Sequence, residues 1–202
     1  MSARAQILTR VRTALGRQSP PPPWQRAYHT RGPLDPGDPQ LLHLLTDRLR
    51  DYAATVRHCT PADLATVLAE VSAGWRIVVP PGFPLPPAGA IADDPPLDHR
   101  VLDSVDAVLT GCAAACADTG TIALDAGPDQ GRRALTLIPD RHICVVHAQQ
   151  VVHTVPELVR RLDPLRPLTF ISGPSATSDI ELNRVEGVHG PRTLIVVLVE
   201  DE

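Results

Sequence analysis

The uninterrupted apolar run Leu-Ile-Val-Val-Leu-Val at residues 194–199 indicates how this 202-residue chain folds. A second run, Ile-Cys-Val-Val at residues 143–146, has the same character. A strand covered on one face alternates apolar and polar residues, whereas a strand covered on both faces is apolar throughout. The two runs therefore predict buried strands in a sheet that has other elements packed on both of its faces.

Shorter apolar runs and helical patterns surround these two strands. Further strands are expected at Trp75–Val79, Val105–Leu109, Thr121–Leu124, Ala134–Ile138 and Leu168–Ile171, with Pro139–Arg141 as a hairpin connection. Helices are expected over Gln40–Arg57, Thr60–Gly74 and Thr154–Leu162. Because helices precede and interrupt the strands, the expected fold class is α/β, with a mixed sheet flanked by helices.

The first residues predict an amphipathic helical arm. Ser2 caps a helix that ends at Gly16 and carries Ile7, Val11 and Leu15 on one face. The following prolines exclude a helix and indicate an extended linker. The expected organisation is an arm at 1–18, a proline-rich linker at 19–39 and a single α/β domain at 40–202. Since an isolated helix of this length is marginal in water, the arm is expected to pack on its own domain or on a partner.

The amino-acid composition excludes several classes of function. The 19 cationic residues are all arginine, which excludes a lysine Schiff base and the lysine of a Walker-type phosphate loop. A net charge of −4 and 3% aromatic residues argue against nucleic-acid binding. No run reaches the roughly 20 apolar residues of a membrane span. Four cysteines are too few for a disulfide scaffold, so the expected location is the cytoplasm.

The first candidate site follows the strand at 168–171. Gly173 allows a ligand to approach the backbone closely, and small hydroxyl residues supply hydrogen-bond donors without blocking access. A helix beginning near Ser178 would add free N–H groups for an anion. The alternative is a helix cap, because Ser178 and Glu181 have the spacing of a capping box. The candidate ligand-binding residues are Gly173, Ser175, Thr177, Ser178 and Asp179.

The second candidate site, at residues 186–192, precedes the last strand. His189 lies near Gly190, and Arg192 is a planar fork suited to a carboxylate or phosphate. A glycine-rich turn is the alternative interpretation. Both candidate segments are expected at strand ends of one sheet, where they would form one anion-binding pocket.

Weaker signals lie between these strands. Gly120 and Thr121 precede a strand and are candidates to present donors to an anion. Cys112 and Cys116 lack two further ligands nearby, so they are interpreted as core residues and no metal site is expected. His142, His147 and His153 are interpreted as structural, and no catalytic residue is assigned.

Three stretches resemble the lactate-utilisation protein C family of the LUD-domain superfamily. They are GRRALTLIPDRHICVV (131–146), ISGPSATSDIE (171–181) and GVHGPR (187–192). The family's marked positions map to Gly120, Thr121, Gly173, Ser175, Thr177, Asp179, Glu181, His189, Gly190 and Arg192. One departure is Asp118, where many members have glutamate, which puts an acid–base role there in doubt.

The resemblance implies a fold similar to the sugar-phosphate isomerase, CoA-transferase and methenyltetrahydrofolate synthetase group. It also implies a subunit that takes part in oxidation of L-lactate to pyruvate beside iron–sulfur partner subunits, with no cofactor bound by this chain alone. Two alternatives stay open. One is a stand-alone enzyme or binding module for an anionic metabolite such as a sugar phosphate, CoA ester or folate-like ligand, and the other is a scaffold.

Overall fold

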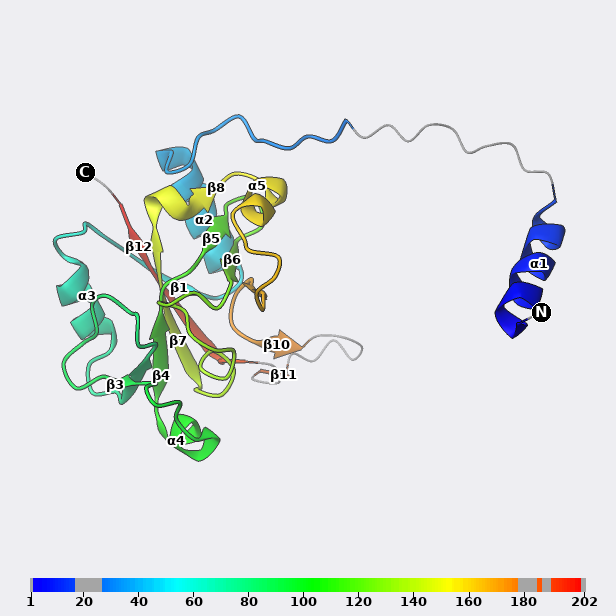
Figure 1. Ribbon diagram of the computed structural model, residues 1–202. Coiled ribbons are helices and arrows are strands. Elements are labelled where there is room, and N and C mark those ends of the chain that lie inside the picture. Colours follow the sequence, from blue (N-terminus) through cyan, green and yellow to red (C-terminus); the bar gives the residue numbers. More distant parts are fainter. Residues whose placement is uncertain (1, 17–26, 178–184, 187–189, 201–202) are drawn as a thin grey trace.

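The computed structural model describes residues 2–16, 27–177, 185–186 and 190–200 (Figure 1). Its centre is a six-stranded sheet with the order β1-β12-β7-β4-β2-β3, in which every neighbouring pair is parallel. The strands are β1 (Thr55–Cys59), β2 (Ile77–Val79), β3 (Ile91–Ala92), β4 (Ala107–Thr110), β7 (Arg141–His147) and β12 (Thr193–Val199). The two long apolar runs are neighbours in it, since Ile143 pairs with Ile195 and Val145 with Val197.

A second, four-stranded sheet has the order β8-β5-β6-β9. Its strands are β5 (Ala114–Cys116), β6 (Thr121–Leu124), β8 (Val151–Val152) and β9 (Thr169–Ile171). β5 and β8 are parallel, and the other two pairs are antiparallel. β10 (Ala176–Thr177) and β11 (Val185–Glu186) form a separate antiparallel pair. The α/β class is therefore confirmed, and a mixed sheet is present, but most of the longer strands lie in a separate six-stranded sheet that is parallel throughout.

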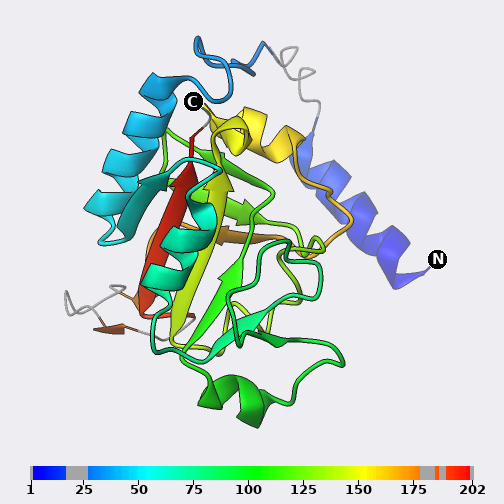
Figure 2. The same cartoon turned by 90° about the vertical axis from the view of Figure 1, so that its left-hand side faces the viewer.

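The parallel sheet is covered on both faces. On one face, α2 (Pro39–Asp51) and the four-stranded sheet pack against Val196 and Leu198. On the other, α3 (Leu64–Val71) packs against Val197 and Val199, and Figure 2 shows this helix in front of the strands. Alternate residues of β12 thus enter two different cores, which is why the strand has no polar face.

The first body helix is shorter than expected. α2 ends at Asp51, and Ala53 adopts a positive φ of 64° as the chain leaves the helix. Val56, which continues the helical spacing of Leu45 and Leu49, lies instead in β1 and pairs with Val196. The predicted helix over Gln40–Arg57 is therefore wrong at its end, because β1 completes an edge of the parallel sheet beside β12.

Residues 134–138 do not form a strand. They form successive turns, with the Ile138 N–H donating to the Ala134 carbonyl at 3.1 Å. Leu135 is fully buried against Leu102 and Val108. The predicted hairpin at Pro139–Arg141 is also wrong, because this segment leads into β7, which pairs in parallel with β4. Leu135 is buried as expected and Ala134 and Ile138 are partly buried, whereas Leu137 is exposed. The segment packs beside α4 (His99–Ser104), whose Leu102 belongs to the same apolar cluster.

Two helical caps appear as the sequence predicts. α1 (Ala3–Leu15) begins after Ser2, whose side chain accepts from the Ala5 N–H at 3.4 Å, and Gly16 is the C-cap residue that follows it. α5 (Val155–Arg160) follows Thr154, which forms a capping box with Glu157. No residue of α1 is buried, and Figure 1 shows the helix apart from the sheets. Within the described ranges, no helix is long and apolar enough to cross a bilayer.

Candidate functional site

The two glycine-containing segments near the carboxyl end meet. The Ser175 N–H donates to the Pro191 carbonyl at 2.8 Å. Gly173 follows β9 of the four-stranded sheet, whereas Gly190 precedes β12 of the parallel sheet. The expectation that both lie at strand ends of one sheet is therefore wrong. The segments come together because one sheet packs over the other.

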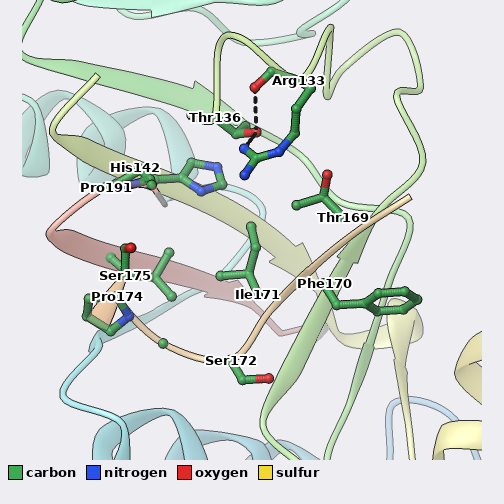
Figure 3. Close-up of a pocket in the computed structure, with 13 residues that line it drawn as sticks. Arg133, Thr136, His142, Thr169, Phe170, Ile171, Ser172, Pro174, Ser175 and Pro191 are labelled. Atoms are coloured by element: carbon green, nitrogen blue, oxygen red, sulfur yellow. Dashed lines mark hydrogen bonds between the residues drawn. The ribbon is translucent and has the colours of Figure 1, made fainter. Parts of the chain in front are cut away.

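A cavity of about 230 Å³ lies where these segments meet. It opens at the amino ends of β7 and β12, since His142 and Leu194 are the second residues of those strands. Figure 3 shows Arg133, Thr136 and His142 along one side and Ile171, Ser172 and Ser175 along the other. Because pockets that bind drug-sized ligands measure about 300–1,000 Å³, this smaller cavity favours a smaller metabolite. The complete lining is Arg133, Thr136, His142, Thr169, Phe170, Ile171, Ser172, Gly173, Pro174, Ser175, Gly190, Pro191 and Leu194.

A buried ion pair holds the segment that brings Arg133 and Thr136 to the cavity. The Arg132 guanidinium donates to both carboxylate oxygens of Asp93, at 2.8 and 3.0 Å, and to the Leu97 carbonyl at 2.6 Å. The Asp93 side chain is 4% exposed. Its pKa lies below the usual value because the bonds from Arg132 and from the Leu97 N–H outweigh the effect of burial. In the next turn, Arg133 Nη1 donates to Thr136 Oγ1 at 3.1 Å.

His142 is the most deeply buried polar side chain of the cavity wall. It is 1% exposed, and its Nε2 lies 2.8 Å from Thr110 Oγ1. Burial, helped by the charge of Arg133, lowers its pKa to about 4. The imidazole is therefore neutral at pH 7. The sequence pattern alone favours a structural histidine at position 142, whereas the structure places His142 in the cavity wall. The available signal is a histidine directly before the apolar run at 143–146.

The predicted site residues Gly120, Thr121 and Thr177 do not line the cavity. Thr121 Oγ1 lies 2.8 Å from Ser172 Oγ, so the 119–121 turn supports the cavity segment without lining the cavity. Gly120 packs against Arg48 instead. Thr177 pairs through its backbone with Val185 in the β10–β11 ribbon. The predicted residues outside the described ranges are Ser178, Asp179, Glu181 and His189.

Arg192 does not line the cavity. Its guanidinium pairs with both carboxylate oxygens of Asp140, at 2.5 and 3.0 Å. Arg192 directly precedes β12 and Asp140 directly precedes β7, so the ion pair connects the starts of these two strands. A backbone hydrogen bond from the Arg192 N–H to the Asp140 carbonyl reinforces this connection. The cavity-lining cation among the described residues is Arg133, which follows Arg132 in the chain and was not singled out from sequence.

The cysteines lie within apolar cores. Cys112, Cys116 and Cys144 are buried, and all four cysteines are free thiols. The hydrogen bond with Cys144, together with burial, raises the pKa of the Cys112 thiol well above its usual value. Within the described part of the chain, no group of three histidine, cysteine or acidic side chains is placed to hold a metal ion.

Gly173 is a position where we expect a small substitution to disturb the site. Its φ is 98°, and an added Cβ would lie 2.6 Å from Tyr52 Cβ and 2.9 Å from the Tyr52 carbonyl oxygen. Gly173→Ala should lower the free energy of unfolding by about 2 kcal/mol, because backbone strain and overlap add. Gly89, with a φ of 81° and open space around it, is the matched control. Gly89→Ala should cost only about 1 kcal/mol in the same urea titration, from backbone strain alone; equal losses would refute the packing argument.

These features define an α/β protein with a small polar cavity between a parallel sheet and a mixed sheet. The chain belongs to the LUD domain family, whose sequence model matches residues 98–199. It is 47% identical over 98% of its length to Lactate utilization protein C of Deinococcus radiodurans, of which it covers 95%. Lactate utilization protein C of Bacillus pumilus is 38% identical over 43% of this chain and 39% of its own length.

A solved structure is similar as well. The crystal structure of a DUF162 family protein from Deinococcus radiodurans matches with a TM-score of 0.69 and 44% sequence identity. The match covers 79% of this chain and 96% of that one. The resemblance drawn from the three motifs is thereby confirmed.

Proposed function

We propose that this chain is a component of an L-lactate utilisation system and that its cavity binds a small organic anion. The observation that carries the proposal is the 47% identity, over almost the full length of both chains, to a protein named Lactate utilization protein C. In this system L-lactate is oxidised to pyruvate by iron–sulfur partner subunits, and this chain acts as a non-autonomous subunit.

The cavity supports an anionic ligand of modest size. Arg133 is solvent-exposed and supplies positive charge on the wall of a cavity that opens to solvent, where two charges attract each other as they do near a protein surface. Thr136, Thr169 and Ser172 add hydroxyl groups around it. Such a combination of one cation and several hydroxyls suits a carboxylate.

The arm supports assembly with partners. Residues 1–34 hold six arginines and no acidic residue, whereas residues 35–202 hold 13 arginines and 23 acidic residues. The α1 side chains Ile7, Val11 and Leu15 are 60%, 48% and 53% exposed. An apolar stripe on so short a helix is stabilised only when it is packed, and here we assign that role to the iron–sulfur subunits.

Growth and co-purification test the proposal. A strain lacking this chain should fail to grow on L-lactate, and the tagged full-length chain from lactate-grown cells should co-purify with iron–sulfur subunits. Replacing Ile7 and Val11 together with Asp should abolish the co-purification. Replacing Thr9 and Thr13 with Asp adds the same charge to the opposite face of α1 and should leave it intact. Normal growth of the deletion strain on L-lactate would refute the proposal.

A stand-alone binding module for a sugar phosphate, CoA ester or folate-like ligand is the second candidate. The observation that favours it is that the cavity lining combines Arg133 with hydroxyl groups, which suits a phosphate as well as a carboxylate. Calorimetry with the purified chain distinguishes the two: tight binding of one of these larger anions, with no heat from lactate or pyruvate, would favour the second candidate.

A further inference from the structure

The hydrogen bonds around Thr110 determine which nitrogen of His142 carries the proton. The Thr110 hydroxyl donates its one hydrogen to the Gly111 carbonyl at 2.8 Å. The same hydroxyl oxygen lies 2.8 Å from His142 Nε2 and has no second hydrogen to give. His142 Nε2 must therefore be the donor. In a neutral imidazole, Nδ1 is then left with a lone pair and is a hydrogen-bond acceptor.

That acceptor belongs to a ring in the cavity wall. Within the described part of the chain, the hydrogen bond of the His142 ring is the one between Nε2 and Thr110. His142 lines the cavity, and Figure 3 shows its ring on the cavity wall beside Arg133 and Pro191. A ligand in the cavity therefore lies beside the imidazole whose Nδ1 is the acceptor.

The cavity thus offers two different groups close together. Arg133 offers a cation with N–H donors, which attracts a carboxylate. His142 offers a neutral acceptor, which forms a hydrogen bond with an O–H donor. A ligand group that has lone pairs but no hydrogen to donate cannot form this bond. Burial keeps His142 neutral at pH 7, so it does not act as a second cation. A ligand that matches both groups carries a negative charge and a hydroxyl group.

We propose that His142 is a specificity-determining residue, through which the cavity selects a hydroxy carboxylate over the corresponding oxo acid. The ligand hydroxyl donates to His142 Nδ1. An oxo group would place its own lone pairs against that nitrogen, and an unsubstituted acid would leave the nitrogen without a partner. This inference rests on the proposed function, because it assumes that an organic anion enters the cavity.

Binding of three matched carboxylates to the purified full chain tests it. L-lactate, pyruvate and propionate differ at one carbon atom, and calorimetry should show L-lactate binding at least about fivefold more tightly than either other acid, the ratio expected for one neutral hydrogen bond. His142→Phe removes the acceptor and should bring the three affinities to within about twofold. His99→Gln, at an exposed histidine, should leave the preference unchanged.

The outcomes separate the two proposals. If none of the three acids binds, the anion cavity of the proposed function is refuted along with this inference. If all bind equally, or if the preference for L-lactate survives in His142→Phe, the inference alone is refuted. Nitrogen-15 NMR of the wild-type histidines adds a readout that does not depend on folding of a variant. The His142 ring should be protonated at Nε2, Thr110→Val should shift that tautomer, and protonation at Nδ1 would overturn the inference.

Discussion

Replacing Asp93 with alanine should lower the free energy of unfolding by about 3 to 5 kcal/mol, as breaking a buried ion pair from one side does. The substitution leaves the Arg132 guanidinium without its two carboxylate bonds and the Leu97 N–H without its acceptor at 2.7 Å. Because the Arg132 side chain is 34% exposed, water will solvate part of it, which places the effect toward the lower end of that range. Urea denaturation monitored by circular dichroism measures the loss.

Two further variants show whether the ion pair is the cause. Asp103→Ala removes an exposed carboxylate from α4 and should change stability by no more than about 0.5 kcal/mol. Arg132→Met combined with Asp93→Ala should cost much less than the sum of the single changes, because both remove the same interaction. Additive losses would show that Asp93 stabilises the fold in another way. Since Arg132 precedes Arg133, the Asp93→Ala variant should also bind carboxylates more weakly.

Stability should fall by about 3 kcal/mol between pH 7 and pH 4 because of His142 alone. Its pKa is about 4 in the folded protein, against 6.5 for an unperturbed histidine. The unfolded chain therefore binds a proton at a higher pH than the folded chain does. The stabilisation is fully present above about pH 6.5 and is lost as the pH falls toward 4. Urea titrations at intervals across this range measure the slope.

The contribution of Asp93 to the pH dependence of stability can be separated from that of His142. The lowered pKa of Asp93 contributes stability that is present above about pH 4 and is lost below it, so its contribution falls at a lower pH. His142→Gln should be less stable at pH 7 and should have a much flatter profile from pH 6.5 to 4. His99→Gln should keep the wild-type profile. A wild-type stability that does not change between pH 7 and pH 5 would contradict the buried neutral state of His142.

The site was predictable in part. The sequence predicts that the segments around Gly173 and Gly190 approach each other, and the Ser175–Pro191 hydrogen bond confirms their proximity. The predicted reason is wrong, because the two segments lie at strand ends of two different sheets that pack together. The roles of Arg192 and His142 did not follow. Arg192 has the geometry of an anion clamp but pairs with Asp140, whereas His142 resembles a core histidine but lines the cavity. Whether a polar side chain faces a ligand or a neighbouring carboxylate depends on residues distant in the chain.

Elements governed by neighbouring residues could be derived from the sequence by itself. The caps at Ser2 and Thr154 and the buried strands at 143–146 and 194–199 depend on residue types and periodicity within a few positions, which act wherever the segment lies. Only the tertiary structure decided that β1 replaces the end of a helix and that Asp93 holds Arg132, 39 positions away. It also decided that a second sheet closes a cavity over His142. Those outcomes depend on how surfaces from distant parts of the chain pack together. The energy of that packing cannot be derived from the residue pattern of any one segment.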